Sequence, residues 1–137
     1  SSSNFAVAVD LNWTKSYEKR SDNPIELAGK VMIKDGRIEE FSENLPVEKK
    51  GYLIGEFLGI IKLRNISTVT LQKHLQQLRK THKGKFHDSH SFGMGKIPDI
   101  IEEVIDLGFT VKPILVSGKW FEVDTILDLE KAKTMFQ

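Results

Sequence analysis

Apolar residues run without interruption near the start of the chain, from Asn4 to Val9. A continuous apolar run of this length is typical of a β-strand that is buried on both faces of a sheet. Such a strand needs a neighbouring strand on each side, so we do not expect it at an edge. Asp10 closes the run, and we expect a short helix through Trp13 and Tyr17 to Glu18 after it.

Two short apolar segments, Lys30–Ile33 and Arg37–Phe41, flank the pair Asp35-Gly36. An Asp-Gly pair between two such segments predicts a β-hairpin with a tight turn. The next apolar segment, Gly51–Leu63, contains further glycines. This composition predicts a strand to which another part of the backbone comes very close.

The second half of the chain alternates between helical and extended patterns. Apolar residues recur at helical spacing over Ser67–Lys80, and a long polar loop, Thr81–Lys96, follows. Pro98 favours the start of a helix, Gly108 favours its end, and Phe109–Val116 is expected to be a strand. The order of elements predicts an α/β domain with a mixed sheet and flanking helices.

The stretch from Trp120 to Asp124 predicts a short strand that ends in acidic residues and leads directly into a last helix. Alternate residues of a strand share a face, so Trp120, Glu122 and Asp124 are expected to point the same way. Thr125 and Asp128 match a capping box that starts the helix. Carboxylates at the carboxyl end of a strand lie where open α/β sheets bind ligands, and Mg²⁺ prefers such oxygens.

The composition narrows the classes of protein to consider. The chain has 137 residues, of which 39% are hydrophobic and 28% charged, and its net charge is +1. These values suit one globular domain and give no argument for nucleic acid or membrane as a partner. The absence of cysteine excludes disulfides and thiolate metal sites. No signal peptide or transmembrane run is apparent, so we expect a cytoplasmic protein.

The polar loop and the end of the helix before it carry a cluster of basic residues. Arg79 and several lysines lie there, and we expect them to form a solvated surface. The four histidines lie in the same region, and their spacing repeats no known ligand pattern. The sequence therefore gives no argument for zinc.

Several short motifs together resemble a known family. The motifs are Ala8-Val9-Asp10 with Trp13 and Tyr17, Asp22-Asn23-Pro24 with Glu26 and Lys30, Gly55-Glu56-Phe57, Pro98-Asp99, and Trp120-Phe121-Glu122-Val123-Asp124-Thr125 with Asp128. Their order and spacing resemble the C-terminal half of sugar-phosphate nucleotidyltransferases. Within that superfamily they resemble the branch of phosphocholine and 2-aminoethylphosphonate cytidylyltransferases, which includes part of the phosphoenolpyruvate mutase fusions.

The resemblance implies roles for four residues, which are the two tryptophans, Glu122 and Asp124. Asp124 is expected to bind the catalytic Mg²⁺, because Thr125 already serves the helix cap. Glu122 either acts as a second acid near the metal, or contacts a cationic headgroup of the substrate, or is a solvated strand residue. Trp13 and Trp120 are either cation–π partners of an ammonium group of the substrate or core residues.

Three further residues are candidates for substrate binding or catalysis. A carboxylate within an apolar strand, such as Glu56, needs a ligand or an ion-pair partner. Lys30 is expected either to hold the substrate phosphate or phosphonate, as a catalytic residue, or to pair with Glu56. Asp99 is expected either to face the substrate pocket or to interact with the dipole of its helix.

The resemblance also implies that the nucleotide-binding half of the family is not represented in these residues. Its Gly-rich loop and its middle aspartate have no counterpart, and Phe92–Lys96 is either an anion cradle or a hinge loop. We treat Ser1–Ser3 as a ragged or engineered start and expect residues 4–137 to be one acceptor-side domain. That domain is expected to be inactive alone and to be completed by upstream sequence, another chain or a homodimer.

The expected function is transfer of CMP from CTP to an acceptor like phosphocholine or aminoethylphosphonate, with Mg²⁺ as cofactor. A wall of aromatic and acidic residues suits an ammonium group better than a neutral hexose. The alternative is a binding or assembly module without transferase activity.

Overall fold

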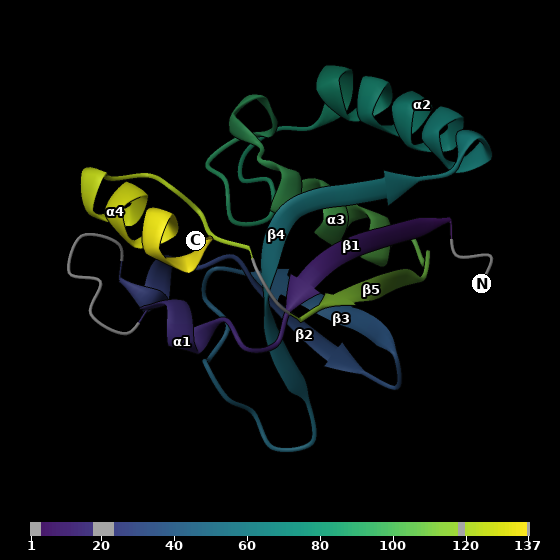
Figure 1. Cartoon of the computed structure of the whole chain (residues 1–137). Helices are drawn as coiled ribbons and strands as arrows, with labels where there is room; N and C mark the ends of the chain where they lie inside the picture. The colour runs from purple at the N-terminus through teal and green to yellow at the C-terminus, as the bar shows by residue number, and fades with distance from the viewer. Residues whose placement is uncertain (1–3, 18–23, 118–119, 137) are drawn as a thin grey trace.

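A five-stranded mixed sheet forms the centre of the molecule in the computed structural model, which describes residues 4–17, 24–117 and 120–136 (Figure 1). The strands are β1 (Phe5–Asp10), β2 (Lys30–Lys34), β3 (Arg37–Ser42), β4 (Leu53–Leu63) and β5 (Val111–Val116). Their order in the sheet is β3-β2-β4-β1-β5. β1 and β5 are parallel, whereas the other pairs are antiparallel. This confirms the expected mixed sheet.

Strand β1 lies inside the sheet, between β4 and β5, and all of its residues are buried. The continuous apolar run therefore predicted its position correctly. Phe5, Val7 and Val9 join the main core, which also contains Val31 of β2 and Val111 of β5. β1 thus connects β4 and β5, which come from different halves of the chain.

The β2–β3 hairpin turns at the predicted Asp-Gly pair. Asp35 has φ 50° and Gly36 has φ 73°, so both lie in the left-handed region. Two consecutive left-handed residues are typical of the type I′ turn, whose twist matches that of the flanking strands. The hairpin prediction is confirmed.

The described residues form four α-helices and two short 3₁₀ segments in addition to the sheet. The α-helices are α1 (Thr14–Tyr17), α2 (Asn65–Thr81), α3 (Ile97–Asp106) and α4 (Ile126–Met135), and the 3₁₀ segments are η1 (Ile25–Leu27) and η2 (Phe92–Met94). Figure 1 shows α1 and α4 beyond the arrow end of β1, and α2 at the far side of β4. None of the described helices is long and apolar enough to cross a bilayer.

Helix α3 covers the sheet next to β3, and its Ile101 and Val104 enter the core. The backbone N–H of Phe41 donates to Glu102 on this helix. Burial raises the pKa of Glu102 to about 7, although that hydrogen bond opposes the rise.

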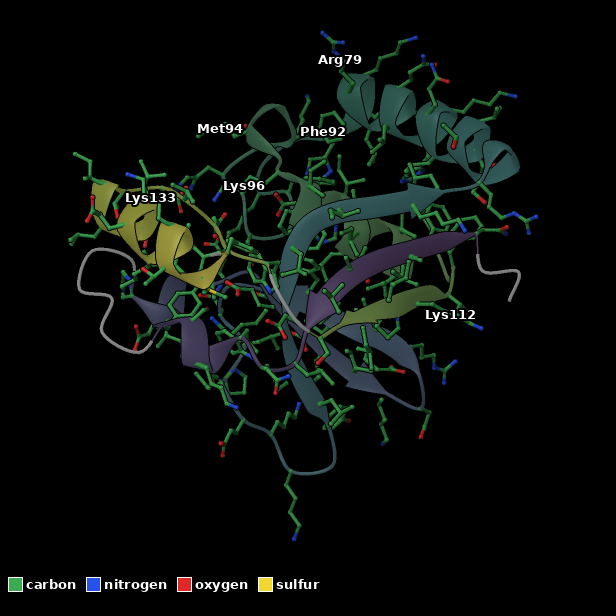
Figure 2. The ribbon with its side chains drawn as sticks, viewed as in Figure 1. Arg79, Phe92, Met94, Lys96, Lys112 and Lys133 are labelled. Carbon is green, nitrogen blue, oxygen red and sulfur yellow. The ribbon has the colours of Figure 1, made fainter. Side chains whose placement is uncertain are left out.

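Helix α2 is mostly polar on its outer side. Its buried apolar residue is Leu71. Figure 2 shows Arg79 on the outer side of α2 and Lys112 pointing outward from β5, and both side chains are exposed. The expectation that Arg79 belongs to a solvated surface is confirmed.

The predicted strand from Trp120 to Asp124 is not formed. In this segment, backbone N–H groups donate to a side chain and not to a neighbouring strand. The backbone N–H groups of Asp124 and Thr125 donate to Oδ2 of Asp128, at 3.3 Å and 3.0 Å. Thr125 Oγ1 in turn accepts from the Asp128 N–H at 3.1 Å, which confirms the capping box. Ser1–Ser3, Glu18 and Asp22-Asn23 lie outside the described residues.

Strand β4 passes very close to β1 at Gly55. A β-carbon at this position would lie 2.3 Å from Cγ1 of Val9 and 3.0 Å from the carbonyl oxygen of Asp10. Only glycine fits without moving the end of β1. The sheet also curls, so that its two edge strands, β3 and β5, approach each other.

The substitution Gly55→Ala is expected to destabilise the protein by about 1–3 kcal/mol, because the added methyl group overpacks a rigid contact between two strands. The free energy of unfolding in urea measures this effect. Gly93→Ala is the matched control, since the nearest atom to its β-carbon, Ser91 Oγ, would be 4.0 Å away. Equal midpoints for the two variants would show that β4 can move away from β1 at no cost.

Candidate functional site

An open cavity of about 680 Å³ lies at the carboxyl ends of the two parallel strands. β1 ends at Asp10 and β5 at Val116, and these two residues are paired in register. The cavity is lined by β1, α1, the segment that follows β5, and α4, through residues that include Asp10, Asn12, Lys15, Trp120, Phe121 and Lys131. Ligands of α/β sheets commonly bind at this end of parallel strands. We therefore take this cavity as the candidate site.

Asp10 is the acidic residue in the described lining of the cavity. Its side chain is almost buried, with 7% of the residue exposed. Oδ1 accepts a hydrogen bond from the backbone N–H of Asn12 at 2.7 Å, and Oδ2 accepts one from Nε1 of Trp120 at 2.7 Å. The first bond turns the chain from β1 into α1. The second fixes an indole ring beside the carboxylate, across a separation of 110 residues in sequence.

Cationic and hydroxyl groups line the remainder of the cavity. Lys15 comes from α1 and Lys131 from α4. Ser16, Ser117 and Thr134 add hydroxyl groups to the same lining. Ammonium and hydroxyl donors can bind a phosphate or phosphonate group. The cavity thus offers an acid and an aromatic ring for a cation, together with donors for an anion.

Three of the residues that the sequence singled out, Trp13, Lys30 and Glu56, come together beneath α1. The indole of Trp13 is 1% exposed and donates to the carbonyl of Ile54 at 3.2 Å. Its ring meets that of Tyr17 edge to face, with centroids 5.8 Å apart, and Tyr17 Oη donates to Glu56. Lys30 lies opposite Glu56 across the β2–β4 pair. None of these three residues lines the cavity at the strand ends.

Lys30 is 1% exposed. Its Nζ donates to the carbonyl oxygens of Glu26 and Ala28, at 2.8 Å and 3.1 Å. Burial lowers the pKa of Lys30, although the nearby carboxylates of Glu43, Glu26 and Glu56 oppose the shift. In this position Lys30 ties η1 to the sheet. Its expected catalytic role stays a prediction, as do the substrate roles of Trp13 and Glu56.

Asp99 organises the start of α3. It accepts hydrogen bonds from the backbone N–H of Lys96 at 2.7 Å, from the N–H of Asp88 at 2.9 Å and from Ser89 Oγ at 2.7 Å. Burial opposes ionisation of this carboxyl, but the three hydrogen bonds outweigh it and lower its pKa. Asp99 is absent from the cavity lining. Its substrate role also stays a prediction.

Trp120 is the predicted site residue that lines the cavity, whereas Glu122 and Asp124 follow it on an exposed segment. The exposed carboxylate of Asp124 suits Mg²⁺, which proteins often hold through one or two carboxylates, with water and substrate phosphates as the other ligands. Asp124 therefore supplies one donor of a type that suits the expected ion. The metal role of Asp124 stays a prediction.

Three lining residues, Asp10, Lys15 and Lys131, were not predicted from the sequence as site residues. Asp10 had one recognisable sign, since an acid directly after a buried strand lies at the end where α/β sheets bind ligands. Lys15 and Lys131 carry no such sign, because they meet only when α1 and α4 lie beside the same strand ends.

Two known proteins resemble the chain, although no family model matches it. A CTP:phosphoglutamine cytidylyltransferase of Campylobacter jejuni is 23% identical over 125 residues, which are 91% of this chain and 47% of that protein. An inositol-1-phosphate CTP transferase of T. maritima has a similar structure, with a TM-score of 0.58 and 19% identity, over 99% of this chain and 46% of the other.

The chain is similar to cytidylyltransferases. The solved structure confirms the nucleotidyltransferase type of fold. The similarity to a phosphoglutamine cytidylyltransferase does not single out the phosphocholine branch. The chain spans about half the length of both proteins that it matches.

Proposed function

We propose that these residues form part of a cytidylyltransferase that moves CMP from CTP to an acceptor bearing a phosphate or phosphonate group. The observation that carries this proposal is the cavity at the ends of β1 and β5. It combines Asp10 and Trp120 with the ammonium groups of Lys15 and Lys131. The similarity to two CTP-dependent transferases supports the same conclusion.

The bond changes define what this cavity would do. An oxygen of the acceptor phosphate or phosphonate attacks the α-phosphorus of CTP, a new P–O bond forms, and the bond to the leaving pyrophosphate breaks. Lys15 and Lys131 would neutralise and orient the attacking group, which is charged and repels the nucleotide phosphates. Positioning and charge neutralisation are the main contributions in reactions of this kind. Mg²⁺, held in part by Asp124, would neutralise phosphate charge.

We further propose that the acceptor carries an ammonium group, as phosphocholine and 2-aminoethylphosphonate do. The indole of Trp120 is held beside a nearly buried carboxylate, so a cation would meet a ring face and a negative charge together. A cation–π contact contributes roughly 0.5–2 kcal/mol. The proposal concerns the complete protein, since the matched proteins are about twice as long and other residues would take part in CTP binding.

The test measures pyrophosphate release by the complete protein with CTP, Mg²⁺ and one of three acceptors: phosphocholine, 2-aminoethylphosphonate or glucose 1-phosphate. We expect the ammonium-bearing acceptors to react faster. Trp120→Ala should weaken their binding by about threefold to thirtyfold and change glucose 1-phosphate little. Faster use of glucose 1-phosphate would rule out the ammonium acceptor. CTP binding without any pyrophosphate release would favour the binding-module alternative.

A further inference from the structure

A second group of chemically active side chains lies away from the cavity, between α2, the loop that follows it, and α3. Glu103 of α3 is at its centre. Its Oε1 lies 2.6 Å from Nε2 of His74 on α2, and its Oε2 lies 2.8 Å from Nε2 of His87 in the loop. Asp106 of α3 completes the group, with Oδ2 4.0 Å from Nδ1 of His87. None of these residues lines the cavity at the strand ends.

The fold holds His87 in a fixed and unusual backbone conformation. Its φ is 48°, in the left-handed region that few residues other than glycine adopt. The loop is closed around it by a pair of backbone hydrogen bonds between Phe86 and Ser89, both of 2.9 Å. The ring of Phe86 packs against the imidazole, with centroids 4.7 Å apart. The imidazole is thereby directed at Glu103.

The group is sheltered on one side and open on the other. The exposed fractions of the side chains are 17% for His87, 16% for Glu103 and 66% for Asp106. Glu103 and Asp106 are one helical turn apart, so they share a face of α3. An ion could enter past Asp106 and be surrounded by the other two side chains.

We propose that His87, Glu103 and Asp106 bind one divalent transition-metal ion, for which Zn²⁺ is the best-suited candidate. The imidazole nitrogen and the two carboxylate oxygens are all ligand types that Zn²⁺ takes, and water could fill a fourth position. One candidate ligand atom from each residue lies within 4.8 Å of the other two. Tetrahedral Zn²⁺ with ligands at about 2.0 Å places those atoms roughly 3.3 Å apart, so only small side-chain movements are needed.

His74 serves as a positioning residue in this site. It holds Oε1 of Glu103 and leaves Oε2 directed toward His87. Carboxylates that bind metals are usually oriented by such a second hydrogen bond. The bound ion would connect α3 to the loop, and through His74 also to α2. This link would stabilise α2, which covers an apolar cavity of about 210 Å³ lined by Leu71, Leu75 and Ile101.

The test is a titration of the untagged protein with Zn²⁺ in competition with a chromophoric chelator, in the absence of CTP. We expect one ion per chain. His87→Asn removes the imidazole and keeps a residue that tolerates the left-handed region, so the backbone is not further strained. This variant should bind Zn²⁺ at least about 10-fold more weakly, since even loss of an outer partner costs about 10- to 100-fold in affinity.

His90→Asn is the matched control, because His90 is an exposed histidine of the same loop outside the group. It should bind Zn²⁺ as the wild type does, and His74→Asn should weaken binding by about 10-fold. Circular dichroism checks that each variant is folded. A second readout is the melting temperature, which Zn²⁺ should raise in the wild type and in His90→Asn but not in His87→Asn.

Two results would overturn the proposal. One is the absence of saturable binding of one Zn²⁺ per wild-type chain, in which case the histidines only form hydrogen bonds to Glu103. The other is equal Zn²⁺ affinity of His87→Asn and His90→Asn. Because neither measurement involves CTP or turnover, this proposal and the cytidylyltransferase proposal can fail independently.

Discussion

Replacing Asp10 by asparagine is expected to lower kcat/KM for CMP transfer by the complete protein by roughly 10- to 100-fold. Both carboxylate oxygens of Asp10 accept hydrogen bonds of 2.7 Å, from Asn12 and from Trp120. Asparagine offers one oxygen for two donors and removes the charge. Hydrogen bonds to charged groups contribute about 1.5–3 kcal/mol, which corresponds to that range of rates. Steady-state kinetics over a range of acceptor concentrations measures the loss.

Two companion variants separate the possible causes. Trp120→Phe keeps an aromatic face but lacks the Nε1 donor, so it tests whether Asp10 acts by holding this ring. Asp35→Asn is the control for the chemical change, since Asp35 lies on the β2–β3 turn and asparagine tolerates its φ of 50°. If folded Asp10→Asn turned over acceptor as Asp35→Asn does, the cavity at the strand ends would not be the site of the reaction.

Much of the fold could be predicted because local chemistry and tertiary packing agree. The run of apolar residues in β1 is buried on both faces, so its neighbours on each side follow from composition alone. The β2–β3 turn needs two left-handed residues, and Asp35-Gly36 supplies them. Thr125 and Asp128 form a cap within one turn of α4, without help from distant residues.

The segment from Trp120 to Asp124 shows where local pattern fails. Its alternation fits a strand, but a strand also needs a free edge partner, and sequence pattern does not report partners. Here the indole of Trp120 donates a hydrogen bond to Asp10, and the backbone N–H groups at the end of the segment donate to the Asp128 carboxylate. One long-range bond, from Trp120 to Asp10, and local bonds to Asp128 thus replace a strand ladder in this segment.

The candidate site was predictable only in part, for the same reason. Trp13 and Trp120 look alike in sequence, yet the first is buried against Tyr17 and the second lines the cavity. The two rings differ in their long-range partners, because the indole of Trp13 donates to the carbonyl of Ile54 and that of Trp120 donates to Asp10. The histidine group was missed because its members come from two helices and a loop, so their spacing in sequence resembles no ligand motif.

Asp124→Asn is expected to reduce kcat of the complete protein by on the order of 100-fold or more, since a metal ion supplies several kcal/mol of charge stabilisation in such reactions. The substitution removes one negative charge and keeps the shape of the side chain. Stability should change little, because the carboxylate is exposed and the hydrogen bond to Asp128 comes from the backbone of Asp124. The measurement is kcat as a function of Mg²⁺ concentration, together with the melting temperature.

The control is Glu130→Gln, which neutralises an exposed carboxylate on α4 and should leave both quantities unchanged. If Asp124 holds Mg²⁺, higher Mg²⁺ should partly restore the rate of Asp124→Asn, since a weakened site fills by mass action. A loss of rate that no Mg²⁺ concentration changes would indicate that Asp124 contacts the substrate. Wild-type turnover by the variant at limiting Mg²⁺ would exclude Asp124 as a ligand and would direct attention to Asp10, whose carboxylate lines the cavity.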